Sequence, residues 1–294
     1  MDRLRQLDRF RRSLEGASDR RIILISATAG MGKSWLLNQF AYEARQHNAP
    51  VALIDFSDSQ AYDVLALVRR FRDSLGAEHF NRLTAEINDA TAPRIVFNDS
   101  GPAGGGVAVG DNVQAGDIRI GDVAGRNIIK DNLFIVQSDN PLLIQALEDR
   151  ITQVFFQCLQ DLVVQQRALF LFDTYESNSQ SSESWVASKA DRWIMRELLS
   201  RIRDGQLPNT VVVLAGRRLP EFGVEWGKVI GRLELELFTI EDVGQYLREN
   251  RGLANLSDQD VQTLYNAVQG NPQLLGIIGD NLEQTNRATD EDDW

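Results

Sequence analysis

A short segment near the N-terminus has the residue types that bind phosphate groups. Four apolar residues, Ile22–Ile25, are followed by the letters SATAGMGKS, which end in Lys33 and Ser34. A loop of small residues lets backbone N–H groups point inward, and a following helix adds the positive end of its dipole. In the pattern G-x-x-x-x-G-K-[ST], the lysine reaches the outer phosphates and the hydroxyl coordinates Mg²⁺. We therefore expect a nucleoside triphosphate with Mg²⁺ to bind here. The expected contacts are Ala29, Gly30, Met31, Gly32, Lys33, Ser34 and Trp35.

One position departs from this phosphate-binding pattern. The first glycine of the motif is replaced by Ala27, whereas Gly30 and Gly32 are present. Alanine is the smallest substitute, which is compatible with a distorted loop that still binds phosphate. The alternative is a chance match or a decayed loop. The strand and helix signals on either side are the context that the motif requires, and they favour the binding loop.

A second segment supplies the acidic side chains that such a site needs. The apolar run Leu169–Phe172 ends in Asp173, as in the Walker B pattern. We expect Asp173 to hold Mg²⁺ together with the Ser34 hydroxyl. Glu176 is the candidate for polarising the attacking water. The alternatives are a strand-end cap for Asp173 and an exposed loop glutamate for Glu176. With Lys33, these carboxylates predict hydrolysis of the nucleotide.

Two more charged residues follow predicted strands. Arg217 comes after Val211–Leu214 and is the candidate for stabilising charge on the γ-phosphate. A solvated surface charge is the alternative for Arg217, and Arg218 is the other arginine at this place. Asp55 follows another predicted strand, and we expect it to be a loop cap rather than part of the site.

The elements that must position these residues alternate between strand and helix. Such alternation is typical of a parallel sheet with helices on both sides. Apolar runs and helical spacing predict helices over Arg5–Leu14, from Lys33 through Ala44, through Val64–Leu75, over Pro141–Gln166 and through Trp193 and Leu199. Predicted strands cover Ile22–Ile25, Val51–Ile54, Leu169–Phe172, Val211–Leu214 and Leu233–Phe238. In the last of these, leucine alternates with glutamate, which predicts an edge strand.

Two regions differ from this alternating pattern. Residues 99–139 are rich in glycine and aspartate, and Gly-Asp pairs recur every five or six residues. They predict an insertion of short β-arcs, with a flexible loop as the alternative. After Thr239 the signals are only helical: Ser257 is a good N-cap, Gly270 ends one helix and Pro272 begins another. We predict a nucleotide-binding domain over 1–238, a helical lid over 239–284 and an acidic tail over 285–294.

Composition excludes several classes of function. The chain has 42 acidic and 31 basic residues, a net charge of −11, so it has no general attraction to nucleic acid or to anionic membranes. A local basic patch is compatible with this composition. The single cysteine, Cys158, excludes an intramolecular disulfide and a cysteine-based zinc cluster, and its spacing predicts core packing. No stretch approaches the roughly 20 apolar residues of a membrane helix. The charged N-terminus shows no targeting segment, so we expect a cytoplasmic protein.

The order of these segments resembles that of the STAND class, the signal-transduction ATPases with numerous domains. These belong to the AAA+-like P-loop proteins and are close to NACHT and NB-ARC modules. Outside the insertion the resemblance covers nearly the whole chain. It rests on Asp2–Leu7, Ala29–Ser34, Leu171–Glu176, Leu214–Arg217 and Gly270–Leu274.

The resemblance implies an α/β P-loop NTPase fold. Its five-stranded parallel sheet is flanked by helices, the P-loop strand lies between the Walker B strand and an edge strand, and a small helical lid follows. The resemblance also implies that ATP or ADP is the nucleotide and that Pro272 contacts the adenine. Of the early Gly-Arg-Glu element of the family, only Arg3 matches.

The function implied by the resemblance is an ATP-driven signalling switch. ADP holds the lid closed, and exchange for ATP opens it and permits self-association. Self-association acts on an effector or sensor domain in cis or in trans, and Mg-dependent ATP hydrolysis resets the switch. Neither neighbouring domain is visible in the sequence, which suggests an excised core or a minimal member. The alternative is an interaction module that binds nucleotide with little or no turnover. A third possibility, an origin-recognition-like AAA+ protein acting on DNA, is disfavoured by the net charge.

Overall fold

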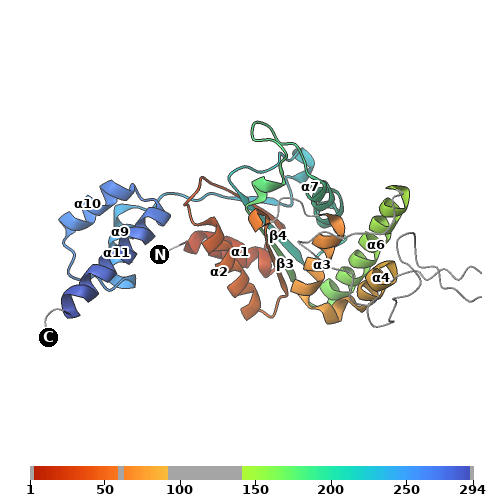
Figure 1. Cartoon of the computed structure of the whole chain (residues 1–294), viewed down its shortest axis with the longest axis horizontal. Coiled ribbons are helices and arrows are strands. Elements are labelled where there is room, and N and C mark those ends of the chain that lie inside the picture. The colour runs from red at the N-terminus through yellow and green to blue at the C-terminus, as the bar shows by residue number, and fades with distance from the viewer. Residues whose placement is uncertain (1–2, 59–62, 92–140, 292–294) are drawn as a thin grey trace, which may run out of the picture. The chain divides into compact units, whose positions relative to one another are not determined.

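The structure is a computed structural model that describes residues 3–58, 63–91 and 141–291. The predicted insertion at 99–139 therefore lies outside the described residues. The chain divides into two compact units, drawn in Figure 1. The larger unit comprises Met1–Gln60 and Leu162–Trp294, and the smaller unit comprises Ala61–Asp161. Every described strand belongs to the larger unit.

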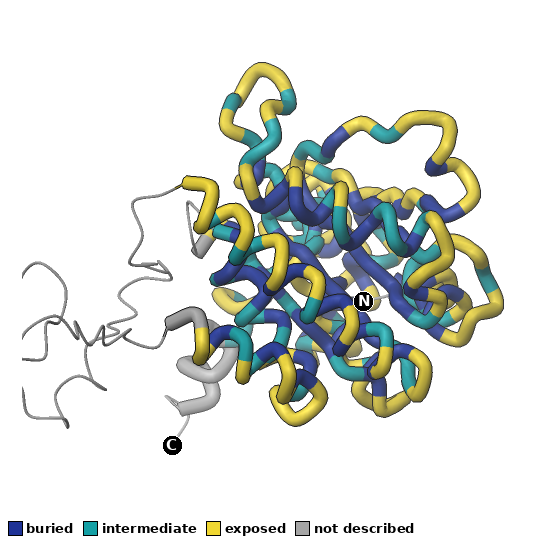
Figure 2. Tube along the Cα trace, turned by 90° about the vertical axis from the view of Figure 1, so that its right-hand side faces the viewer, coloured by how far each residue is buried: buried dark blue, intermediate teal, exposed yellow. Residues whose placement is uncertain are grey.

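A five-stranded parallel sheet forms the larger unit's centre, in the order β2-β3-β4-β1-β5. The strands are β1 (Ile22–Ser26), β2 (Val51–Asp55), β3 (Ala168–Asp173), β4 (Thr210–Gly216) and β5 (Ile230–Leu233). All residues of β3 and β4 are buried, as expected of interior strands covered on both faces. Figure 2 shows these strands as a dark-blue interior. The structure thus confirms the α/β fold with a five-stranded parallel sheet.

The strand order corrects one prediction. The strand before the phosphate-binding loop does not neighbour the Asp173 strand, because β4 lies between them. Ile25 of β1 is in register with Ala215 of β4, and Ser26 with Gly216. The apolar run of β4 is buried on both faces and takes the central place in the sheet. As a result, the residues that follow β4 emerge between the ends of β1 and β3.

The predicted strand Leu233–Phe238 is wrong. Strand pairing occupies β5 and ends at Leu233. Beyond β5, the carbonyl of Glu236 accepts a hydrogen bond of 3.0 Å from Arg3 Nη1. This backbone carbonyl is therefore bound by a side chain and not by a neighbouring strand. The side chain of Leu237 is 53% exposed. The leucine-glutamate alternation therefore belongs to the connection that follows β5 and not to a strand. The last strand of the chain, β5, does lie at the edge of the sheet, as predicted.

Two helices pack against alternate residues of the sheet. The core of α1 and α2 is continuous with inward residues of all five strands, and the rings of Phe10 and Phe40 stack at 4.0 Å. Connections of the sheet contain further short helices. The helical segments are α1 (Leu4–Leu14), α2 (Lys33–Gln46), η1 (Phe56–Asp58), η3 (Tyr175–Asn178), α7 (Lys189–Trp193), the π-helical η4 (Ile194–Leu199), α8 (Ser200–Arg203) and η5 (Val224–Trp226).

The C-terminal helices have a hydrophobic core of their own, which includes Phe238, Leu247 and Leu275. They are α9 (Ile240–Gln245), the π-helical η6 (Tyr246–Asn250), α10 (Asp258–Val268) and α11 (Pro272–Glu291). Ser257 forms the predicted N-cap of α10, in a capping box with Asp260. The predicted acidic tail starts at 285 within α11, which continues to Glu291. No glycine or proline interrupts the sequence there.

The smaller unit is helical in its described residues. It contains α3 (Val64–Leu75), η2 (Ala77–Phe80), α4 (Asn81–Thr91) and most of α6 (Pro141–Gln165). Phe155 stacks with Phe80 at 5.6 Å and lies 5.9 Å from Phe71. Cys158 is buried, as predicted. In the described part of the chain, no helix is long and apolar enough to span a bilayer.

Candidate functional site

The loop between β1 and α2 has the backbone conformation of an anion-binding turn. Gly30 and Gly32 adopt positive φ angles of 79° and 82°, and Gly32 is the N-cap of α2. A Cβ atom added to Gly32 would meet nothing within 4 Å, so the space beside this backbone is open. Left-handed residues next to a helix start form concavities of N–H groups that bind anions. The local conformation therefore fits a phosphate group.

Ala27 is compatible with this loop although the motif has glycine there. Its backbone is not among the described residues with positive φ. Its N–H donates to the carbonyl of Gly216 at 3.2 Å, and its side chain packs against the core formed with α1 and α2. Because no left-handed conformation is required at this position, the methyl group causes no backbone strain.

Lys33 folds back onto the loop. Its Nζ donates to the carbonyls of Ala27 at 2.7 Å and Thr28 at 2.8 Å. An ammonium group has three N–H donors, so one remains for a phosphate. Burial lowers the pKa of Lys33, outweighing the opposing effect of the Glu176 and Asp173 carboxylates. Both predicted carboxylates are therefore near enough to act on the charge of the predicted lysine.

Asp173 lies at the end of β3 with little exposure, 7% of its surface. One carboxylate oxygen accepts a hydrogen bond of 2.8 Å from the N–H of Thr174. Thr174 has a left-handed backbone with a φ of 50°, which is strained for a β-branched residue. Such strain concentrates at functional sites, and here the strained residue lies between Asp173 and Glu176 in the chain.

The donors present fit Mg²⁺ only in company with a nucleotide. Among the described residues, no cluster of three or more His, Cys, Asp or Glu side chains could hold a metal by itself. Ser34 is exposed on the first turn of α2, and Asp173 has a carboxylate oxygen to offer. Mg²⁺ commonly takes one or two protein oxygens and completes its shell with phosphate and water. Ser34 and Asp173 suit that arrangement.

Glu176 is paired with Arg217 by two hydrogen bonds. Its Oε2 accepts from the Arg217 backbone N–H at 2.9 Å, and its Oε1 accepts from Arg217 Nε at 2.7 Å. Burial raises the pKa of Glu176, but the combined hydrogen bonds and charge of Arg217 outweigh it and lower that pKa below the ordinary value. The carboxylate is therefore ionised, and each of its oxygens accepts one hydrogen bond from Arg217.

The two neighbouring arginines have separate partners. Arg218 donates to the carbonyls of Ser181 and Ser182 and lies over the ring of Trp185 at 5.9 Å. It anchors the loop after η3, whereas Arg217 binds Glu176. This division agrees with the choice of Arg217 as the candidate near the nucleotide.

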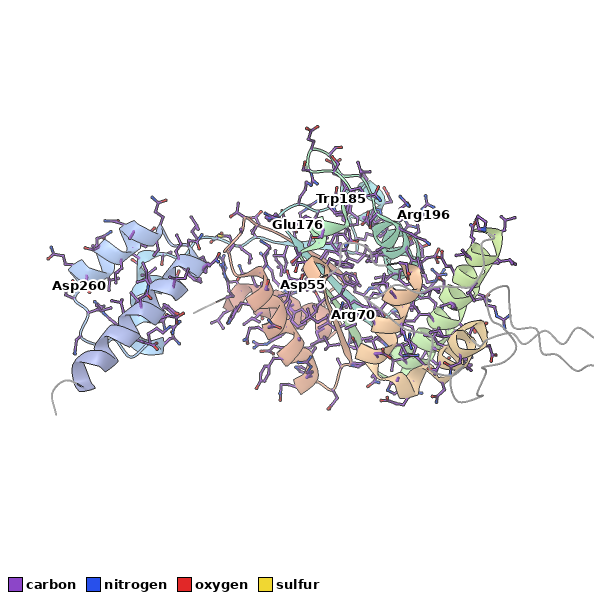
Figure 3. All side chains as sticks on the ribbon, in the orientation of Figure 1. Asp55, Arg70, Glu176, Trp185, Arg196 and Asp260 are labelled. Atoms are coloured by element: carbon purple, nitrogen blue, oxygen red, sulfur yellow. The ribbon has the colours of Figure 1, made fainter. Side chains whose placement is uncertain are left out.

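Asp55 is a cap, as predicted. Its Oδ1 accepts a hydrogen bond of 2.9 Å from the N–H of Ser57, which closes the turn after β2. It is in register with Asp173 on the neighbouring strand. Figure 3 labels Asp55 and Glu176, both of which belong to segments at the ends of strands.

A buried network that sequence reasoning missed supports the turn containing Glu176. Tyr175 donates its hydroxyl to Asp191 Oδ1 at 2.8 Å, and Trp185 donates its indole N–H to Asp191 Oδ2 at 2.9 Å. The two rings stack at 5.9 Å, and Trp185 is labelled in Figure 3. Asp191 is 2% exposed, and burial raises its pKa against these hydrogen bonds. No local sequence pattern marks Asp191, because its partners lie 6 and 16 residues away.

The loop also contacts the connection to the C-terminal helices. Arg3 is buried and donates from Nη2 to the carbonyl of Met31 at 3.2 Å, while its guanidinium lies 5.0 Å from the ring of Phe238. The N–H of Gln273 donates to the carbonyl of Gly30 at 3.1 Å. The helix start at Pro272 is thereby brought to the loop. Gln273 was not predicted, although it adjoins a predicted residue.

The remaining residues predicted to contact the nucleotide differ in how far they are exposed. Trp35 is 43% exposed on the first turn of α2, and Ala29 is exposed in the loop. The side chain of Met31 is buried in the core, so only its backbone faces a ligand. The adenine contact expected of Pro272 remains a prediction.

No protein-family model matches the sequence, and no curated protein sequence matches it. The sequence motifs and the geometry of this site are therefore what indicates a function.

Proposed function

We propose that the chain binds Mg·ATP or Mg·ADP at the loop Ala27–Ser34 and hydrolyses ATP slowly as a signalling switch of the STAND class. One observation supports this most strongly. Lys33 is bound to its own loop carbonyls, and the loop is hydrogen-bonded through Ala27 to Gly216 at the end of β4. The next residue, Arg217, pairs with Glu176, and the charges of Glu176, Asp173 and Arg217 all act on the pKa of Lys33. Phosphate transfer needs such a set of cations and carboxylates around one anion.

Each residue has a distinct role in the proposal. The loop N–H groups and Lys33 bind the phosphates, and Ser34 with Asp173 holds Mg²⁺. The metal neutralises phosphate charge when bound. Glu176 orients and polarises the water once Arg217 has released it, and Arg217 then stabilises negative charge on the γ-phosphate. Pro272 contributes to nucleotide binding at the lid.

The contacts of the loop support a switch rather than an isolated binding site. The carbonyls of Gly30 and Met31 bind Gln273 of α11 and Arg3, respectively. A change in the loop on nucleotide exchange thus acts directly on the start of α11 and on the connection held by Arg3. In the proposal this change frees the C-terminal helices for self-association and for an effector or sensor domain in cis or in trans.

A second candidate function has an observation in its favour. Each carboxylate oxygen of Glu176 accepts a hydrogen bond from Arg217, so in this conformation the carboxylate is held against Arg217. A binding module with little or no turnover would keep this pair closed with ATP bound. Steady-state phosphate release separates the two candidates. The switch predicts Mg-dependent release that Lys33→Ala abolishes, whereas the static module predicts the same background rate for both proteins.

The nucleotide that co-purifies with the protein provides an independent test. The switch predicts ADP or ATP in a molar ratio near one, released on denaturation. Calorimetry with ATP and GTP would then establish the base preference. Absence of any co-purifying nucleotide, together with no binding of either triphosphate, would contradict both candidate functions.

A further inference from the structure

A cavity in the larger unit is lined by several arginines. It measures about 250 Å³ and lies between α1, the segment before β1, and the edge strand β5. None of its lining residues belongs to the phosphate-binding loop. Four arginines line it, namely Arg9, Arg12, Arg20 and Arg232, together with two serines and an apolar floor that includes Ile23 and Leu233.

In the described part of the chain, these arginines lack the carboxylate partners that several other arginines have. Arg11 pairs with Glu43 at 2.6 Å, and Arg72 pairs with Asp73 at 2.6 Å. In the described part of the chain, no ion pair joins any of the four cavity arginines to a carboxylate. The chain has an excess of acidic residues, so an uncompensated positive cavity is not a consequence of composition. Like charges around one cavity repel, and a bound anion relieves that repulsion.

The arrangement of the arginines fits a small, multiply charged anion. Arg9 and Arg12 are three residues apart and lie on one face of α1, while Arg20 and Arg232 come from two other segments. Guanidinium groups bind phosphate through paired N–H donors. The volume corresponds to roughly eight water molecules, which is more than a single phosphate group fills. A ligand with two or more linked phosphates matches both the charge and the size.

Strand addition at the β5 edge is less compatible with this surface. Arg20 donates to the carbonyl of Gly227 at 2.7 Å and also to that of Ile230, at the start of β5. The side chain of Arg20 lies against Gly231, where an added Cβ atom would be 3.3 Å from Arg20 Cβ. Arg20 thus covers the part of the edge that an incoming strand needs.

We infer that this arginine cavity, formed by Arg9, Arg12, Arg20 and Arg232, binds a small phosphate-rich anion separately from the nucleotide loop. The inference does not depend on the proposed function, and pyrophosphate is the simplest probe. Calorimetry uses the full chain carrying Lys33→Ala, which weakens phosphate binding at the loop. Arg12→Gln and Arg232→Gln are then added singly, because both side chains are exposed and, within the described residues, neither makes a hydrogen bond. Arg5→Gln is the control, since it removes the same charge from an exposed position of α1 outside the cavity.

Pyrophosphate should bind the Lys33→Ala protein at one site. Arg12→Gln and Arg232→Gln should each weaken it at least about tenfold, as expected for loss of a charge-assisted hydrogen bond, whereas Arg5→Gln should not. Circular dichroism checks that every variant is folded. Absence of binding to folded Lys33→Ala protein would overturn the inference. Equal weakening by all three arginine changes would also overturn it, because it would show diffuse charge attraction. A DNA duplex that binds more tightly than pyrophosphate, and is weakened equally by Arg5→Gln and Arg12→Gln, would show a nucleic-acid surface instead.

Discussion

Replacing Glu176 by glutamine tests the catalytic part of the proposed site. The side chain of Glu176 is 14% exposed and accepts two hydrogen bonds from Arg217. Glutamine keeps the size and one acceptor oxygen, but its amide group cannot accept the second hydrogen bond and carries no charge. Lys33, Ser34 and Asp173 are unchanged, so Mg·ATP affinity should remain within about threefold of wild type.

The expected effects on stability and on turnover differ enough to be separated. Arg217 is 63% exposed, so solvent screens its pair with Glu176, and we expect Glu176→Gln to lower the free energy of unfolding by about 1 kcal/mol or less. A domain of ordinary stability stays folded after such a loss. Removing a positioned general base costs about a hundredfold in rate, equivalent to about 2.7 kcal/mol. Loss of turnover at retained affinity would therefore report chemistry rather than unfolding.

Single-turnover phosphate release measures the rate, and calorimetry measures the affinity. Light scattering with ATP and with ADP tests the switch, because Glu176→Gln should accumulate in the ATP state and self-associate more with ATP. Arg217→Ala is the companion variant. It frees Glu176 but removes the cation, and turnover should fall at least about tenfold.

Two results would refute this reasoning. Wild-type turnover in Glu176→Gln would show that Glu176 is not the catalytic carboxylate. Faster turnover in Arg217→Ala would show that Arg217 only restrains Glu176 and does not act on the nucleotide. If neither wild type nor Glu176→Gln hydrolyses ATP, the static binding module is the better account.

Three further predictions concern stability. Gly270→Ala should lower the free energy of unfolding of the C-terminal helices by about 2 kcal/mol or more in urea titrations, because Gly270 has a φ of 71° and an added Cβ atom would lie 2.2 Å from the carbonyl oxygen of Phe238. Gly252→Ala is the control, with a φ of 68° but open space, and an equal effect of both changes would contradict the packing argument. Asp191→Ala should destabilise the fold by about 2 kcal/mol, since it leaves the buried donors of Tyr175 and Trp185 unpaired; unchanged urea unfolding would show that this network contributes nothing. Because Arg217 lowers the pKa of Glu176 below its ordinary 4.5, the pair stabilises the fold fully above pH 4.5 and loses this effect as pH falls further. The difference in unfolding free energy between wild type and Glu176→Gln should therefore shrink in acid, and a difference that is constant with pH would contradict the assigned ionisation.

Local sequence patterns predicted the elements that carry the site. The apolar run before the loop, the helix from Lys33 and the strand ending in Asp173 all appear in the structure. Each signal is contained within a few consecutive residues, as a buried run, a helical repeat or a cap. The pairing of Glu176 with Arg217 was not predicted, although both residues were candidates, because 41 residues separate them.

What the sequence did not predict depends on distant parts of the chain. The position of β4 between β1 and β3 depends on which buried run takes the centre of the sheet, and the apolar content of these three strands is similar. The segment after Leu233 has the alternation of a strand, but Arg3 binds its backbone from 233 residues away. Asp191 gives no local signal, because a buried carboxylate is recognised only with its partners in place.

Binding of ATP to the Lys33→Ala variant tests the central claim most directly. Lys228→Ala is the matched control, since Lys228 is an exposed lysine outside the loop. Calorimetry with Mg·ATP should show at least tenfold weaker binding for Lys33→Ala, a loss of roughly 1.4 kcal/mol or more, and unchanged affinity for Lys228→Ala. Unchanged affinity in a folded Lys33→Ala protein would contradict the assignment of the loop as the nucleotide site.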